Sequence, residues 1–207
     1  MSVCSVRHVL LFTFLTLCGA ATVDLGYAVY RGHTLPSGVN EYLGMRYAAP
    51  PLHDRRWRAP QDPDPDPQAA VQDADQFGAS CLGNAPPSLP LALSEDCLFV
   101  NVFTPANATA GANLPVWFFI QGGGFATNTD SVLNGSEVVR RSHHRIVLVG
   151  INYRVGAFGF LASERIRRDG DLNVGLLDQR KALHWAQRYI HLVLSSLNPP
   201  WSMRCIG

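Results

Sequence analysis

The feature that most restricts how this chain can fold is the apolar run Val116–Ile120, which ends abruptly at Gln121 and three consecutive glycines. An uninterrupted run of β-branched and aromatic residues is typical of a strand buried on both faces, as in a parallel sheet covered by helices. Glycines let the backbone turn sharply and leave its amides unshielded. The sequence therefore predicts a buried strand that delivers bare amides to the end of a sheet, where they could form an oxyanion hole. A flexible loop is the commoner meaning of an isolated Gly-Gly-Gly stretch.

The first 20 residues have the three-part pattern of a secretory signal peptide. Arg7 and His8 precede an apolar stretch at residues 9–17, and small residues follow at 19–21. The apolar stretch is too short to span a bilayer, so no transmembrane segment is expected. The alternative is a buried N-terminal helix. The pattern favours secretion and an extracellular location.

Removal of this segment would leave about 187 residues, enough for one domain with a substantial core. The net charge is +1 and no block of like charge occurs, which argues against nucleic acid as a partner. Three aspartates alternate with prolines at residues 62–67. A metal site is conceivable there, but proline extends the backbone and spreads the carboxylates, so we expect a solvated loop and no metal or cofactor.

The cysteines and two sequons fit an oxidising, secretory route. Cys81, Cys97 and Cys205 lie beyond the signal segment. Cys81 and Cys97 could close a small loop and stabilise the fold by about 3 kcal/mol on the chain-entropy model, with Cys205 left free. Asn107 and Asn134 each begin an Asn-x-Ser/Thr sequon, and we expect both to be glycosylated.

The remaining pattern predicts an alternation of strands and helices. A helix at residues 136–142, with Ser136 as its N-cap, separates Val116–Ile120 from a second apolar strand at residues 146–151. Strand, crossover helix and strand make a parallel βαβ unit. Further strands are expected at residues 28–30, 41–49 and 98–104, a loop at 156–161, and a helix at 174–191 whose apolar face carries Leu176, Leu183, Ala186 and Ile190.

Five of these segments, in this order, resemble the type-B carboxylesterase and lipase family, which includes cholinesterases and fungal extracellular lipases. The segments are residues 42–57, 94–105, 116–125, 152–161 and 173–190. Motif matches count only in context, and five collinear ones are far more specific than any single one. The resemblance covers roughly residues 28–191. It implies an α/β fold, namely the N-terminal portion of an α/β-hydrolase fold, with a partial carboxylesterase domain at residues 21–191.

The resemblance also assigns roles to particular residues. Gly123 and Gly124 match the glycines whose amides form two thirds of the family's oxyanion hole, and Gln121 stands where the family often has histidine. Because the amides do the stabilising, glutamine is compatible with that role. Cys81 and Cys97 match the family's first disulfide. Two buried structural ion pairs are implied, Arg56 with Glu95 and Arg154 with Asp178.

The catalytic serine of this family lies in a Gly-x-Ser-x-Gly turn, and no serine here has glycine at both flanking positions. Ser80 comes nearest, with Gly78 before it and Leu82 after it. Residues 192–207 depart from the family pattern, so we expect a chain truncated before the nucleophile strand, lacking the serine, acid and histidine. Four histidines could replace the missing base, but without a nucleophile nearby they are expected to be surface or helix residues: His143, His144, His184 and His191.

Two functions follow. The first is the N-terminal part of a secreted carboxylic-ester hydrolase, inactive as it stands, whose complete relatives take small-molecule or lipid esters. The second is a non-catalytic secreted binding or adhesion protein of the same fold. In either case Val116–Ile120 lacks the neighbouring nucleophile strand, and an open apolar edge of this kind favours aggregation or chaperone binding.

Overall fold

The computed structural model describes residues 22–65, 70–84, 92–108, 112–128 and 132–194. The expected signal segment at residues 1–20, the cysteine at 205 and most of the divergent tail at 192–207 lie outside these residues.

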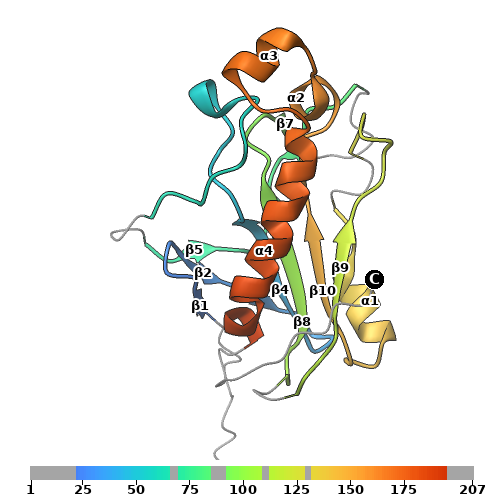
Figure 1. Ribbon diagram of the computed structural model, residues 1–207. Coiled ribbons are helices and arrows are strands. Elements are labelled where there is room, and N and C mark those ends of the chain that lie inside the picture. Colours follow the sequence, from blue (N-terminus) through green and yellow to red (C-terminus); the bar gives the residue numbers. More distant parts are fainter. Residues whose placement is uncertain (1–21, 66–69, 85–91, 109–111, 129–131, 195–207) are drawn as a thin grey trace, which may run out of the picture.

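The centre of the fold is a five-stranded sheet with the strand order β3-β4-β8-β10-β9 (Figure 1). The strands are β3 (His33–Thr34), β4 (Val39–Arg46), β8 (Phe99–Pro105), β9 (Val116–Ile120) and β10 (Val147–Ile151). β4 and β10 pair antiparallel with β8, whereas β9 and β10 are parallel, with Val116 opposite Val147 and Ile120 opposite Ile151. The predicted parallel βαβ unit is therefore confirmed, since α1 (Gly135–Arg141) connects these two strands.

Smaller elements surround this sheet. A second sheet has the order β1-β2-β5, and β6 pairs with β7. Their bounds are β1 Thr22–Asp24, β2 Val29–Arg31, β5 Gln72–Asp73, β6 Ser80–Cys81 and β7 Leu93–Ser94, and a short 3₁₀ turn, η1, spans His53–Arg55.

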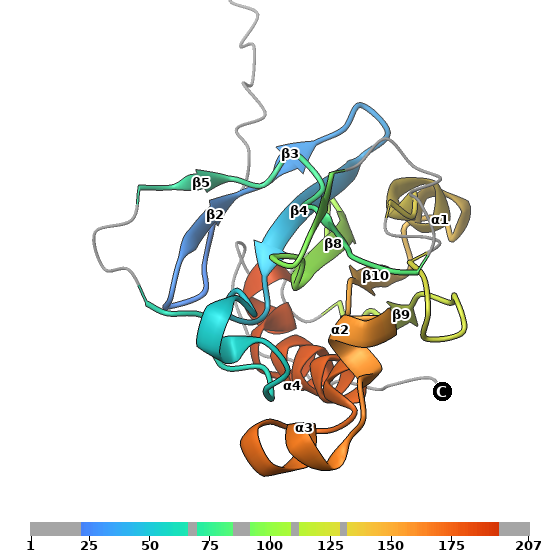
Figure 2. The same ribbon diagram turned by 90° about the horizontal axis from the view of Figure 1, so that it is seen from above.

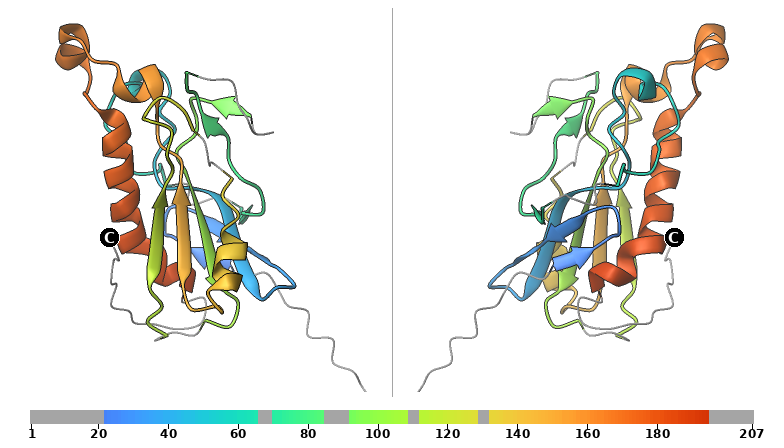
Figure 3. Two further views of the ribbon diagram at one scale, coloured as in Figure 1. Left: turned by 90° about the vertical axis from the view of Figure 1, so that its right-hand side faces the viewer. Right: turned by 90° about the vertical axis from the view of Figure 1, so that its left-hand side faces the viewer.

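Helices cover both faces of the central sheet (Figure 3). The 21-residue helix α4 (Val174–Leu194) packs on one face, where Ala182, Trp185 and Ile190 join the larger apolar core. On the other face, Val139 of α1 packs with Phe103 and neighbouring residues in a smaller core. Two short helices, α2 (Gly156–Phe160) and α3 (Glu164–Asp169), lie near the start of α4.

Two local predictions were wrong. The N-cap of α1 is Asn134, whose side chain accepts a hydrogen bond from Glu137 N at 3.1 Å, so the helix begins one residue earlier than expected. The expected loop at residues 156–161 is largely helix α2. Contacts from distant segments hold this turn, since Gly156 N donates to Phe125 O at 2.7 Å and Trp57 Nε1 donates to Ala157 O at 3.0 Å.

The burial of two apolar segments also differs from expectation. β9 is not buried on both faces: Trp117 and Ile120 keep 51% and 38% of their surface exposed. β9 is the last strand of the sheet among the described residues, and an edge position leaves part of an apolar strand uncovered. On α4, Ala186 and Ile190 are buried as predicted, but Leu176 and Leu183 are exposed.

Candidate functional site

The segments that follow β9 and β10 emerge side by side at one end of the sheet. Because the two strands are parallel, with Ile120 opposite Ile151, their carboxyl ends lie at the same edge. Figure 2 looks onto this end of the molecule, with α2 in front of it. Residues 121–124 continue from β9, and Asn152, Tyr153 and Arg154 continue from β10. The edge beyond parallel strands is where open α/β sheets bind ligands.

The two candidate glycines have backbone conformations that favour glycine. Gly123 has φ +124° and Gly124 has φ +60°. A Cβ at Gly123 would lie 2.0 Å from Thr127 O, so the turn closes only without a side chain. Gly123 O accepts hydrogen bonds from the amides of Ala126 and Thr127, both at 3.1 Å. At Gly124 a Cβ would meet nothing within 4 Å, which means that this residue faces open space.

The amides of these glycines are available as donors. Throughout the described part of the chain, neither Gly123 N nor Gly124 N donates a hydrogen bond. Gly124 is exposed and Gly123 is half-buried. Two adjacent amides without an acceptor, held by a fixed turn, can stabilise negative charge on an oxygen atom.

A chain of hydrogen bonds holds the start of this turn. Gln121 is 2% exposed, and its carbonyl accepts a hydrogen bond from Tyr153 Oη at 3.0 Å. Burial raises the pKa of Tyr153, so its hydroxyl stays protonated and continues to donate. The Gln121 side chain donates to Asn128 Oδ1, and Asn128 Nδ2 donates to Cys81 O at 2.9 Å.

Helix α2 holds the other end of the turn. Gly156 N, in the first turn of α2, donates to Phe125 O at 2.7 Å. The Phe125 ring packs against Phe160, with 5.0 Å between ring centroids. Asn84 N donates to Ala126 O at 2.8 Å, so a third segment also braces the loop. No local pattern indicates these supports, because the residues that form each contact lie 31 to 42 positions apart in the sequence.

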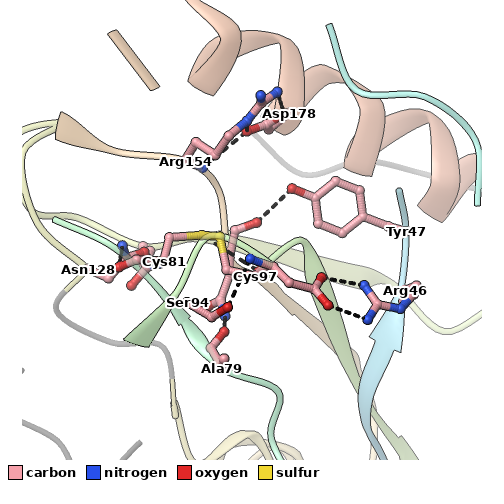
Figure 4. Close-up of a disulfide and its surroundings, with 12 residues drawn as sticks. Arg46, Tyr47, Ala79, Cys81, Ser94, Cys97, Asn128, Arg154 and Asp178 are labelled. Atoms are coloured by element: carbon pink, nitrogen blue, oxygen red, sulfur yellow. Dashed lines mark hydrogen bonds and ion pairs between the residues drawn. A yellow bond between two sulfur atoms is a disulfide. The ribbon is translucent and has the colours of Figure 1, made fainter. Parts of the chain in front are cut away.

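Cys81 and Cys97 are joined by a disulfide, with their Cα atoms 5.0 Å apart (Figure 4). The bond connects β6 to the segment that leads into β8, and both residues are buried in the larger core. Because Cys81 O also accepts the bond from Asn128, the disulfide is two hydrogen bonds away from Gln121.

Arg154 and Asp178 form a fully buried pair that joins the segment after β10 to α4 (Figure 4). Their side chains are 3% and 0% exposed. Arg154 Nε and Nη2 donate to the two carboxylate oxygens at 2.8 and 2.7 Å, and Arg154 N donates to Asp178 Oδ2 at 3.1 Å. Burial raises the pKa of the Asp178 carboxyl, while the hydrogen bonds and charge of Arg154 oppose that rise.

The pair between Arg56 and Glu95 is present but is not buried as expected. Arg56 Nη2 donates to Glu95 Oε1 at 2.8 Å, and Nε donates to Oε2 at 2.5 Å. Their side chains remain 37% and 21% exposed, because η1 and the residues after it lie at the surface of the molecule. The hydrogen bonds to Glu95 raise the pKa of Arg56.

The other candidate residues lie apart from the glycine turn. In the residues that the structure covers, no histidine ring hydrogen-bonds to a serine hydroxyl; the His144 ring lies 3.1 Å from Ser37 O. Asn107 and Asn134 are both exposed. No group of three or more potential metal ligands gathers within the described ranges. None of the described helices combines the length and apolarity that crossing a bilayer requires.

Comparison with known proteins identifies relatives for most of the chain. Residues 20–192 match the model of the carboxylesterase family. The chain is 38% identical to mouse cholinesterase over 176 residues, covering 77% of this chain and 28% of that protein. It is 36% identical to the mouse pyrethroid hydrolase Ces2a over 165 residues, covering 74% and 28%. It is 34% identical to lipase 2 of Geotrichum candidum over 182 residues, covering 73% and 32%.

Solved structures give the same answer for the fold. The crystal structure of Aspergillus niger EstA matches with a TM-score of 0.78 and 53% identity, over 83% of this chain and 33% of EstA. A thermophilic pNB esterase matches with a TM-score of 0.73 and 32% identity, over 83% of this chain and 35% of the esterase. The chain therefore spans about a third of the length of the relatives it matches.

Proposed function

Because the chain belongs to the carboxylesterase family, we propose that residues 21–191 are the N-terminal part of a serine carboxylic-ester hydrolase and that Gly123 and Gly124 supply two oxyanion-hole amides. Membership confirms the resemblance drawn from the motifs, and the matched structures confirm the α/β-hydrolase fold. The carrying observation is the pair of unpaired glycine amides at the carboxyl end of β9. The substrates proposed are small-molecule or lipid esters.

The chemistry of the proposed role follows from where charge develops. When a serine attacks an ester carbonyl, the carbonyl oxygen becomes an oxyanion, and donors aimed at it bind the transition state more tightly than the substrate. The backbone of residues 121–126 is fixed before substrate arrives, by Tyr153 at one end and Gly156 at the other. Its donors therefore need little reorganisation during the reaction.

We propose further that this sequence does not hydrolyse esters alone. An oxyanion hole stabilises charge that a nucleophile must first create, and the sequence contains no Gly-x-Ser-x-Gly turn. The serine, the histidine and the acidic residue of the triad, and the third oxyanion amide, would come from sequence that is not present here.

A chimera tests the assignment. Residues 1–191 would be fused to the part of A. niger EstA that follows its matched region, and hydrolysis of p-nitrophenyl butyrate would be measured. We expect turnover that a serine-directed organophosphate blocks, and none from the 207-residue chain. Gly124→Pro removes one donor and cannot adopt the φ of +60° at this position, so it should lower kcat by at least about 10²–10³-fold. Gly124→Ala keeps the N–H and should lower kcat by less. Wild-type turnover by a folded Gly124→Pro chimera, or saturable hydrolysis by the unfused chain, would overturn the proposal.

Secretion and glycosylation belong to the same proposal. The signal pattern at residues 1–20, the Cys81–Cys97 disulfide and the exposed sequon asparagines Asn107 and Asn134 support a secreted glycoprotein. Expression in a eukaryotic host, followed by enzymatic removal of N-glycans, tests it. We expect the mass of the wild type to fall when the glycans are removed. The fall should be smaller in Asn107→Gln and in Asn134→Gln, because each variant lacks one acceptor. Retention of the intact N-terminus in the cytosol would contradict it.

The absence of a Gly-x-Ser-x-Gly turn favours a second candidate, a non-catalytic secreted binding or adhesion protein. Sequencing the transcript through codon 191 separates the two. A reading frame that continues into Gly-x-Ser-x-Gly supports the hydrolase, and one that ends after codon 207 supports the binding protein.

We also propose that the 207-residue chain self-associates or binds chaperones through β9. Among the described residues β9 pairs on one side only, and Trp117 and Ile120 are exposed beside its free edge. Such an edge invites strand pairing. Analytical ultracentrifugation should find oligomers that the double change Trp117→Lys and Ile120→Lys reduces. A monodisperse wild-type monomer would contradict the proposal.

A further inference from the structure

A groove of about 480 Å³ lies between the residues that follow η1 and helix α3. Residues 53–58 form one wall and residues 161–170 the other, about 110 positions later in the sequence. Figure 1 places both segments at the same end of the molecule as α2. The volume is within the range of small-molecule sites. Neither Gly123 nor Gly124 lines the groove, so its assignment is independent of the proposed ester hydrolysis.

Hydrogen bonds tie the two walls together. Asp171 N donates to Trp57 O, and Ala59 N donates to Asp171 Oδ2, both at 2.8 Å. Arg58 Nη2 donates to Asp169 Oδ1 at 3.0 Å. The groove is therefore formed before any ligand binds, which lowers the entropic cost of binding.

The wall formed by residues 53–58 carries strained backbone around an aromatic ring. His53 and Trp57 have φ values of +51° and +55°, which are rare for bulky side chains. Trp57 is held there by a hydrogen bond from its Nε1 to Ala157 O at 3.0 Å and by stacking on Phe158. Strain of this kind persists where the surroundings fix it, and it gathers at ligand sites.

The charges in the groove favour an anion of single charge. Arg56 and Arg58 commit only their Nε and Nη2 atoms, and Arg165 makes no ion pair with any described residue. Two carboxylates, Asp54 and Asp169, also line the groove, and only Asp169 is paired with an arginine. The unpaired Asp54 repels a dianion such as phosphate more strongly than a monoanion.

The groove also offers apolar surface. Leu161 and Ile166 line it together with the Trp57 ring, and Leu161 is 41% exposed. Guanidinium groups bind carboxylates through paired N–H donors. We propose that this groove binds a small amphipathic carboxylate, with its headgroup on Arg165 and its alkyl chain along Trp57, Leu161 and Ile166.

Titration of the purified full chain with octanoate tests the proposal. Calorimetry at low ionic strength, with the Trp57 indole N–H followed by NMR, should show saturable binding that moves the Trp57 signal and leaves that of Trp185 unchanged. Affinity should rise from acetate through butyrate to octanoate, by up to about fourfold for each methylene buried. Octanamide, which lacks the charge, should bind more weakly than octanoate.

Three variants of exposed residues locate the headgroup. Arg165→Gln should weaken octanoate binding by about three- to tenfold. Asp54→Asn should strengthen it, because a repulsive charge is removed. Arg168→Gln is the matched control, since Arg168 lies on the same helix, pairs with Glu164 and does not line the groove. Matching melting temperatures would show that all three variants fold.

Failure of octanoate to saturate, or equal affinities in Arg165→Gln and Arg168→Gln, would overturn the proposal. Tighter binding of inorganic phosphate than of octanoate would also overturn it, as would binding to phosphatidylglycerol vesicles without binding to monomeric octanoate. Tighter binding of phosphate would indicate a phosphate site, and binding to the vesicles alone would indicate a surface for anionic lipid.

Discussion

The neighbouring strands β9 and β10 are both five residues long and almost wholly apolar, yet every residue of β10 is buried, whereas only Val116 of β9 is. The contrast continues beyond the strands. After β10, Asn152, Tyr153 and Arg154 are buried and hydrogen-bonded. After β9, Gly122 and Gly124 are exposed and the glycine amides have no acceptor within the described residues.

The two segments at this edge of the sheet therefore have different roles. The segment after β10 links the sheet to α4 through a buried ion pair, and it also supplies the Tyr153 hydroxyl that steadies Gln121. The segment after β9 leaves its donors free for a ligand. Rigid elements that carry an open loop are the usual construction of a binding or catalytic site. Stability should therefore depend mainly on β10, and binding on β9.

The largest expected effect comes from the buried pair after β10. Asp178→Asn leaves the Arg154 guanidinium buried without a counter-charge and should destabilise the fold by about 3–5 kcal/mol. Urea unfolding followed by circular dichroism measures the change. The control is Glu95→Gln in the half-exposed pair with Arg56, which should cost a small fraction of that. Equal losses in both variants would remove the distinction between the two pairs.

Matched truncations in the two strands should give the next largest difference. Leu148 of β10 is fully buried and pairs in register with the half-exposed Trp117 of β9. Leu148→Ala should cost about 2–5 kcal/mol, because it leaves a cavity in the core. Trp117→Ala should cost less than about 1 kcal/mol, although the side chain it removes is larger. The comparison is made on dilute, monomeric protein, where a greater loss from Trp117→Ala than from Leu148→Ala would contradict the contrast between the two strands.

Within the turn after β9, the two glycines should respond differently to alanine. Gly123→Ala combines a disfavoured φ with a clash against Thr127 O, and should cost about 3 kcal/mol. Gly124→Ala adds only backbone strain, about 1 kcal/mol, since its Cβ would enter open space. Thermal melts of both variants measure this. A reversed order would show that Gly124, and not Gly123, fixes the shape of the turn.

The smallest effect concerns α1, the crossover between the two strands. Hydrogen bonds from Arg140 and then Arg141 lower the pKa of Glu137 from its ordinary 4.5 to about 2. A carboxyl whose pKa is depressed in the folded state stabilises the fold above its unfolded pKa, and this contribution is lost as pH falls from about 4.5 towards 2. In low salt the wild type should lose more stability over this range than Glu137→Gln. The difference should shrink in 1 M salt, because the pair is exposed. If the stability of the wild type and of Glu137→Gln depended on pH in the same way, the ion pairs of Glu137 would not stabilise the fold.

The pattern of apolar runs predicted the strands β2, β4, β8, β9 and β10 and the parallel pairing of β9 with β10, but it missed the short strands β1, β3, β5, β6 and β7. It did not predict their burial, because a strand's position in the sheet depends on partners far away in the sequence. The same limit explains why the exposure of Leu176 and Leu183 was not predicted. They repeat at helical spacing with Ala186 and Ile190, but the buried face of α4 contains Ala182 and Trp185 beside those two residues, and Leu176 and Leu183 lie outside it.

The candidate site was predictable only in its central residues. Consecutive glycines after an apolar strand indicated where bare amides would lie, and the resemblance supplied their role. The supports of the turn were missed, since Tyr153, Asn128 and Gly156 carry no local signal and act through contacts across the fold. The burial of Arg56 and Glu95 was overestimated because a pairing motif does not encode depth.

Amide hydrogen exchange, measured by NMR on the ¹⁵N-labelled chain, tests most directly the claim that β9 ends in free donors beside a fully bonded β10. Asn152 N donates to Phe99 O at 3.0 Å just after β10, and its exchange should be slowed by about 10³-fold or more. Gly123 and Gly124 should exchange within about tenfold of the rate of an unprotected amide, because neither has an acceptor in the described structure. Protection of either glycine amide comparable to that of Asn152 would contradict the account.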